Sequence, residues 1–419
     1  MKFSLLPLAV GICGLFMLIR LRFFLFRRPK KCLNKLLSEF RSKEARGALC
    51  LALAGTLGVG NIFGVAAGLI IGGAGSLFWL LLSAVFSSVI KYSESTLCSG
   101  LKKEGRGGMQ YVLEELYPKY GKALGSVYAL LCLALALFMG ASMQSAAVSD
   151  TFYNSFGFFP AGCGIILCLL LIISVIRGVS GIERLTARLI PVSAAVYSLM
   201  AFSVIAMNID NLPLALSRIF SEAFGIRQAA GGVSAFLFSK ALGEGFARGI
   251  LSNEAGIGTS SMALSRMSAE SPAAVGLFGI FEVFLDTVVL CPLTALAVLL
   301  SVPDISAYKT PMSLLCAAFD STLGSFSLYI LAFCISLFAF STIICWYYYG
   351  SECCVYLFRK DRPFLYTFLF LFSIFFGALS DSLGIIAITD SVIFLMAMLT
   401  LFTILRFSGK IAELTKNGV

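Results

Sequence analysis

Long apolar runs are the feature that most limits what this chain can fold into. A helix needs about 20 mostly apolar residues to cross the hydrocarbon core of a bilayer, and the sequence holds about eleven such runs. Hydrophobic residues make up 59% of the chain and charged residues 13%, which leaves too little polar surface for soluble domains of this length. We therefore predict an all-α membrane protein that crosses the lipid bilayer many times.

The predicted spans are a leading helix over residues 4–26 and a set of core helices. The core helices are expected over 47–71, 75–98, 122–151, 160–176, 187–207, 231–263, 273–301, 324–357, 364–381 and 384–407. They form two groups of equal size, and the second group starts on the opposite side of the membrane from the first. This spacing predicts an inverted-topology repeat of five helices plus five. The predicted divisions are 1–46 (leading helix and basic segment), 47–207 (first repeat), 208–407 (connecting outer loop and second repeat) and 408–419 (tail).

The net charge of +10 is distributed as a membrane protein distributes it. Basic residues gather in alternate connections and are almost missing from the connections around 152–160 and 302–324. The basic stretches are 20–46, 102–122, 177–188, 359–362 and the C-terminal tail. Because basic loops stay on the cytoplasmic side, we expect the N-terminus outside and the C-terminus inside a cell membrane, and no nucleic acid as a partner.

Histidine is missing from the sequence, and its 13 cysteines form no CxxC pair. These counts exclude His-based acid–base chemistry and a Cys/His zinc site. We interpret the cysteines as small packing residues and expect neither an enzyme nor a resident cofactor.

Glycines interrupt the first predicted core helix at Gly55, Gly58 and Gly60. The structural alternative is close packing of small residues against another helix. Thr56 and Asn61 favour a break instead, because polar side chains at this depth are costly unless they face a partner or a cavity. An unwound segment would offer amide donors to a carboxylate and carbonyl acceptors to a cation.

The sixth core helix is interrupted in the same place, at Ser252–Gly258. Arg248 and Glu244 are one turn apart and are expected to pair. Glu254 lies inside the break, where it could bind a coupling ion, carry a proton or pair with a basic residue.

Other carboxylates lie within predicted spans. Glu282 and Asp286 are one turn apart on the seventh core helix and could pair with Arg248 or Lys240. Asp390 in the tenth core helix lies either in the membrane or near its outer interface. Carboxylates at such positions are functional candidates by default.

Five motifs in order resemble the alanine/glycine:cation symporter family. They are AGTLGVGNIFGVA at 54–66, GASMQS at 140–145, RGILSNEAGIG at 248–258, FLDT at 284–287, and FST at 340–342 with Trp346. The resemblance runs from the leading helix to the C-terminus. It implies a leucine-transporter-type fold and sodium-driven uptake of small neutral amino acids, alanine and glycine above all, by alternating access.

The same resemblance implies a binding site. The substrate residues would be Gly55, Thr56, Gly58, Gly60, Gln144, Asn253 and Trp346. Trp346 would cap the pocket and limit the substrate side chain to about a methyl group.

The sodium ion, a co-transported substrate, would bind the hydroxyls of Ser341 and Thr342 and the carbonyls near Gly55 and Gly58. The two hydroxyls could instead bond back to their own helix.

Some features keep other interpretations open. Gly107–Gly108 lacks the Pro that often follows this pair in the family. Leu251 stands where the family tends to have Phe, and because a smaller side chain could widen the pocket, strict alanine/glycine selectivity is not implied. Proton coupling through Glu254 or Asp286 is the first alternative, and a channel is the second. The sequence leaves the oligomeric state open.

Overall fold

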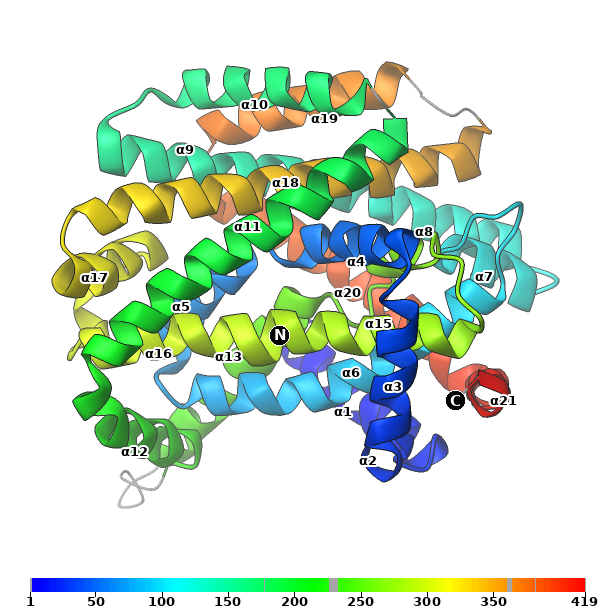
Figure 1. Ribbon diagram of the computed structural model, residues 1–419, viewed down its shortest axis with the longest axis horizontal. Coiled ribbons are helices and arrows are strands. Elements are labelled where there is room, and N and C mark those ends of the chain that lie inside the picture. The colour runs from blue at the N-terminus through cyan, green and yellow to red at the C-terminus, as the bar shows by residue number, and fades with distance from the viewer. Residues whose placement is uncertain (1, 177, 226–232, 360–363, 381, 419) are drawn as a thin grey trace.

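The computed structural model describes residues 2–176, 178–225, 233–359, 364–380 and 382–418, and helices account for almost all of them (Figure 1). The elements up to residue 207 are α1 (Lys2–Arg20), α2 (Phe24–Arg27), α3 (Pro29–Glu39), α4 (Lys43–Thr56), η1 (Val59–Asn61), α5 (Phe63–Gly72), α6 (Ser76–Gly100), α7 (Met109–Leu116), α8 (Gly121–Leu135), η2 (Ala136–Ser142), α9 (Met143–Phe156), α10 (Pro160–Val175) and α11 (Gly178–Met207). The later elements are η3 (Ile209–Asn211), α12 (Leu212–Ala223), α13 (Val233–Asn253), α14 (Ser260–Leu264), α15 (Pro272–Val283), η5 (Phe284–Leu290), α16 (Cys291–Ser301), η6 (Ile305–Ala307), α17 (Pro311–Leu323), α18 (Phe326–Phe358), α19 (Phe364–Leu379), α20 (Ser382–Arg406) and α21 (Ser408–Gly418).

The helices form a multi-pass membrane protein. Within the described ranges, six helices are long and apolar enough to cross a bilayer, and a seventh span is added if α4 and η1–α5 are taken as one bent helix. Large apolar side chains such as Ile173, Leu199 and Phe364 are mostly exposed on α10, α11 and α19, as lipid-facing surfaces require. The all-helical membrane class is confirmed, and the count of eleven spans stays a prediction.

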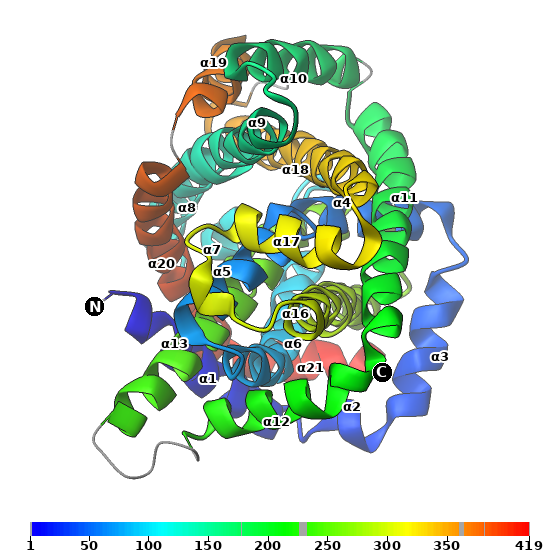
Figure 2. The same ribbon diagram turned by 90° about the vertical axis from the view of Figure 1, so that its left-hand side faces the viewer.

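The first core helix is broken where the glycines predict a break. Its axis bends by 58° between Lys43–Thr56 and Val59–Gly72. In Figure 2 the two pieces, α4 and α5, lie inside the bundle, with α11 on one side and α20 on the other. The broken helix therefore lies in the interior of the protein, as a binding site requires.

Helix α6 packs closely against both α13 and α15. Glycines permit the close approach: a Cβ on Gly249 would lie 2.0 Å from the Ser83 hydroxyl, and one on Gly276 would lie 2.2 Å from the Thr96 hydroxyl. Small residues at such crossings let helix backbones meet in a membrane protein. This contact brings the polar side chains of α6 to the second break.

Helices α10 and α19 lie side by side along one edge of the bundle, beyond α9 and α18 (Figure 1).

Two wide turns of π-helix, η2 and η5, interrupt the third and seventh core helices. Such bulges are frequent at functional sites.

The connections are more helical than predicted. Helix α11 begins at Gly178 rather than near residue 187, because its charged first turns continue past the apolar run, with Arg184 Nε donating to the Ser180 carbonyl. The segments expected to be outer turns contain α12 and α17, both with a proline in the first turn, where proline favours helix initiation. Residues 231, 232 and 381, which lie at predicted span ends, fall outside the described residues.

Candidate functional site

The first break begins where α4 ends at Thr56. The Gly58 N–H donates to the Thr56 carbonyl over 2.9 Å and to Asn61 Oδ1 over 3.3 Å, so the chain makes a tight turn before η1. Helical backbone bonding resumes in α5. This leaves a short length of unwound backbone inside the bundle, which is stable only where it lines a cavity or is bonded by other groups.

The third and eighth core helices meet this turn at Gly58. A Cβ placed on Gly58 would lie 2.7 Å from Thr342 Oγ1 of α18 and 3.6 Å from Gln144 Oε1 of α9. Gly55 lies against the same helix α18, where its Cβ would be 2.9 Å from the Tyr349 hydroxyl. The structure thus brings together four of the predicted site residues. Gly60 differs, since a Cβ there would have no atom within 4 Å.

Four buried polar atoms around this turn have no hydrogen-bond partner among the described residues. They are Thr56 Oγ1, Gln144 Oε1, Trp346 Nε1 and the Tyr349 hydroxyl. Native proteins pair nearly all such atoms, and each exception calls for an explanation. Three of the four belong to residues that the sequence predicts to bind substrate, and Tyr349 is an addition that the sequence did not predict; a polar ligand would supply the missing partners.

Trp346 is fully buried and packs on the π-helix of the third core helix. A Cβ on Gly140 would lie 2.2 Å from Trp346 Cβ, so only glycine fits there. The indole also meets the Tyr349 ring edge to face, with ring centroids 5.5 Å apart. The tryptophan is therefore held rigidly, one turn of α18 beyond Thr342.

The hydroxyls of Ser341 and Thr342 both donate to the Phe338 carbonyl, each over 2.9 Å. This is the back-bonding alternative that the sequence left open. These bonds use the hydroxyl hydrogens only, so both hydroxyl oxygens keep lone pairs that could bind a cation. Thr342 also faces Gly58 of the first break.

The second break follows α13, which ends at Asn253. Glu254, Gly256 and Gly258 have positive φ values of 54°, 88° and 85°, so the helix cannot continue. Asn253 Nδ2 donates to Thr287 Oγ1 over 3.1 Å, and its Oδ1 accepts from the Ala255 amide over 3.0 Å. The Asn253 side chain thus stabilises its own break and is not brought to Gly58.

Asn61 joins the two breaks directly. Its Nδ2 donates to Ser252 Oγ over 3.0 Å and to Asp286 Oδ1 over 2.6 Å. The second carboxylate oxygen of Asp286 accepts from Ser252 and Thr287, each over 2.7 Å.

Asp286 could have paired with Arg248 or Lys240, but among the described residues it forms neither ion pair and accepts from three neutral donors instead. Arg248 pairs instead with Glu244 at 3.2 Å, as expected from their spacing.

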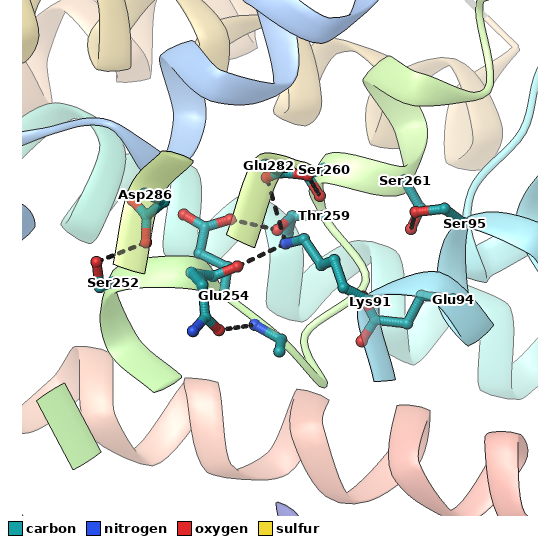
Figure 3. Close-up of polar contacts among 12 residues, drawn as sticks. Lys91, Glu94, Ser95, Ser252, Glu254, Thr259, Ser260, Ser261, Glu282 and Asp286 are labelled. Carbon is teal, nitrogen blue, oxygen red and sulfur yellow. Dashed lines mark hydrogen bonds and ion pairs between the residues drawn. The ribbon is translucent and has the colours of Figure 1, made fainter. Parts of the chain in front are cut away.

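Lys91 and Glu94 of α6 form a second polar cluster, with Glu254 and Glu282, that sequence reasoning missed (Figure 3). Lys91 Nζ donates to the Asn253 carbonyl over 2.6 Å and lies 3.4 Å from Glu282 Oε1. Glu282 thus pairs with Lys91 rather than with Arg248 or Lys240. A usable signal was present, because two charged residues inside the apolar run 75–98 are functional candidates by default.

Glu254 and Asp390 are the remaining carboxylates that the sequence marks as candidates. Glu254 accepts from the Thr259 hydroxyl over 2.6 Å and makes no ion pair with Arg248. Asp390 is half-buried and lines a small cavity together with Leu6 of α1 and Ala247 of α13.

Two broken helices that meet at buried polar residues inside an all-helical membrane bundle define the molecule as a secondary transporter. Comparison with known proteins agrees. The sequence matches the sodium:alanine symporter family over residues 1–417, and the chain belongs to this family. Its members are transporters and not enzymes, and membership together with the fold supports cation-coupled amino-acid symport.

Similar proteins are found both by sequence and by structure. The sodium/alanine symporter AgcS of Methanococcus maripaludis is 31% identical over 96% of this chain and 91% of its own length. The probable sodium/glutamine symporter GlnT of Bacillus subtilis is 33% identical over 96% and 85%. The fold resembles a Na⁺-coupled sialic acid symporter, with a TM-score of 0.54 and 14% identity over 100% of this chain and 87% of that one. It also resembles the Eremococcus coleocola manganese transporter, with a TM-score of 0.56 and 12% identity over 85% and 76%.

Proposed function

We propose that this protein imports small neutral amino acids, alanine and glycine first, together with sodium. The observation that carries this proposal is the group of buried, unpartnered polar atoms at the first break. Thr56, Gln144 and Trp346 come from three different core helices, and an amino-acid zwitterion has the donors and acceptors that they lack.

Different residues of the site would bind the carboxylate, the ammonium group and the side chain of the substrate. A substrate carboxylate would accept from backbone amides of the unwound segment around Gly58 and Gly60, where helix N-termini favour negative charge. The Gly58 amide would first release its bonds to the Thr56 carbonyl and Asn61 Oδ1. The ammonium group would donate to Gln144 Oε1, which is buried and free. Trp346, held against Gly140, would limit the space left for the substrate side chain.

Sodium would bind beside the substrate. The Thr342 hydroxyl oxygen faces Gly58 and retains lone pairs, and Ser341 lies next to it in α18. Carbonyls near Gly55 and Gly58 would complete a set of neutral oxygen ligands of the kind that hard cations prefer. A site shared by α4 and α18 would couple ion binding to the position of the first break.

We also propose eleven spans arranged as a leading helix and two inverted repeats of five, a leucine-transporter-type fold. In support, each half contains one broken helix, and the breaks contact each other through Asn61 and Ser252. Alternating access would open this shared point to each side of the membrane in turn, with the N-terminus outside the cell and the C-terminus in the cytoplasm.

The substrate range needs a direct test, because the relatives carry different names: one is a sodium/alanine symporter and another a probable sodium/glutamine symporter. Purified protein in liposomes should take up labelled alanine when a sodium gradient is imposed, and unlabelled glycine should compete. Glutamine is the comparison substrate, and an imposed proton gradient without sodium is the comparison driving force. If no small neutral amino acid enters under either gradient, the proposed function is wrong.

A further inference from the structure

The cluster around Lys91 has a charge imbalance that the proposed substrate and sodium sites do not explain. Lys91, Glu94, Glu254 and Glu282 are all fully buried. With every group ionised, one positive charge would face three negative ones, a net charge of −2. Uncompensated charge inside a membrane protein is costly, so such groups pair or become neutral.

Lys91 has contacts that account for only one of the three carboxylates. Its ammonium group lies 3.4 Å from Glu282 Oε1 and donates to the Asn253 carbonyl over 2.6 Å. That carbonyl belongs to the C-terminal end of α13, which attracts a cation by itself. Glu282 also accepts from the Ser260 hydroxyl over 3.1 Å. Lys91 and Glu282 therefore form a balanced pair, which leaves Glu94 and Glu254.

Each of these two glutamates has one bonded and one free oxygen. Glu94 Oε1 accepts from the Gly256 amide over 2.5 Å, and Glu254 Oε2 accepts from the Thr259 hydroxyl over 2.6 Å. Glu94 Oε2 and Glu254 Oε1 are buried without a partner among the described residues. A buried carboxylate ion with one oxygen bare carries an uncompensated charge, whereas the protonated carboxyl group is neutral and its burial costs far less.

Among the described residues, the side chains around the cluster supply no second cation. The other titratable side chains that face the cluster come from five elements, and all are acids or neutral groups. They are Asp286 of η5, Tyr128 of α8, Cys345 and Tyr349 of α18, Cys13 of α1 and Cys98 of α6. Within the protein itself, the groups that can restore neutrality are the glutamates, by taking up protons.

We propose that the Glu254 carboxyl group holds an exchangeable proton, and that this proton leaves when the second break opens to water. Glu254 is the first residue of the break, with φ of 54°, so any rearrangement of the break moves it. Glu94 belongs to the unbroken helix α6, so a rearrangement of the break alters its contact with the Gly256 amide but not its own backbone. In the exchange step the O–H bond of Glu254 breaks, its electron pair stays on the carboxylate, and the proton passes to water.

The claim that the Glu254 proton moves during transport rests on the proposed function. The claim that Glu254 is protonated does not rest on it, so the two claims can be tested separately.

The first test detects the proton spectroscopically in purified protein. Protonated carboxyl groups show an infrared C=O band that carboxylates lack, and the band shifts in D₂O. We expect a wild-type minus Glu254→Gln difference spectrum to contain this band. Glu254→Asp, which keeps a carboxyl group, should shift the band without removing it and serves if the Gln variant does not fold. Glu115→Gln, at an exposed position on α7, is the matched control and should give no band.

The second test follows proton movement in liposomes with a pH-sensitive dye inside. Alanine uptake by the wild type and by Glu115→Gln should acidify the lumen, and Glu254→Gln should lower that acidification to the level of empty liposomes. The inference is overturned if the infrared band is unchanged in both Glu254 variants. It is also overturned if the wild type takes up alanine without acidification. If alanine is not transported at all, the proposed function fails while the infrared result still decides the protonation of Glu254.

Discussion

Gly58 gives the sharpest test of the proposed pocket, because Thr342 of α18 and Gln144 of α9 both lie close to it. In Gly58→Ala the new Cβ would lie 2.7 Å from Thr342 Oγ1, whereas unstrained contacts between heavy atoms are about 3.5 Å or longer. The backbone at Gly58 has φ of −126°, which alanine adopts freely, so the effect is steric. Thr342 must turn away, and its hydrogen bond to the Phe338 carbonyl is lost.

The expected magnitude follows from these two effects. Losing the hydrogen bond costs about 1 kcal/mol, and overpacking a tight site costs about 1–3 kcal/mol. The free protein avoids this cost by turning Thr342 away, whereas ligand binding needs Thr342 in place, so the cost is taken from the binding free energy. Even the lower sum, about 2 kcal/mol, then corresponds to roughly 30-fold in affinity. We expect the half-saturating concentrations of both alanine and sodium to rise by at least this factor in proteoliposome uptake.

Gly64→Ala is the matched control, since a Cβ on Gly64 meets no atom within 4 Å and lies in helix α5 of the same broken span. The double variant Gly58→Ala/Thr342→Ala removes the clash, so alanine affinity should recover while sodium affinity stays weak. The pocket assignment is refuted if Gly58→Ala and Gly64→Ala show the same concentration dependence for both ligands.

Three further predictions concern the surrounding residues. Asp286→Asn replaces an acceptor by an NH₂ group that faces the donors of Asn61, Ser252 and Thr287. Leaving these buried donors unpaired costs about 1–3 kcal/mol, so initial uptake rates should fall about tenfold or more. Gly140→Ala would push Trp346 away and lower the thermal unfolding midpoint in detergent, whereas Gly11→Ala, with open space around its Cβ, should not. Gln144→Ala should raise the half-saturating alanine concentration about tenfold; an unchanged value in folded protein would remove this residue from the site.

The two helix breaks could be predicted from the sequence because their cause is local. Glycine weakens a helix wherever it stands, and glycines cluster at 55–64 and again at 256–258. Both breaks are present in the structure, as is the pairing of Arg248 with Glu244 one turn apart. These features depend on neighbours a few residues away, which a sequence displays directly.

The contacts between distant helices could not be predicted in the same way. Lys91 meets Glu282 across 191 positions, and only the packing of α6 on α15 brings them together. The direction of the Asn253 side chain depends likewise on Thr287, which the π-helix η5 places within reach. A π-helix has no local sequence signature comparable to a glycine cluster, so the contact between Asn253 and Thr287 could not be predicted from the sequence.

The close fit of α6 has a consequence for motion. Its backbone lies against α13 at Gly245 and Gly249 and against α15 at Gly279, and its Thr96 and Tyr92 side chains fill the space beside Gly276. Three helices in such contact cannot slide past one another without steric clashes, since packed interfaces shift between discrete arrangements. They would move as one rigid body during the transport cycle. The bending that opens the binding site to either side of the membrane would then occur at the unwound turns next to this rigid body.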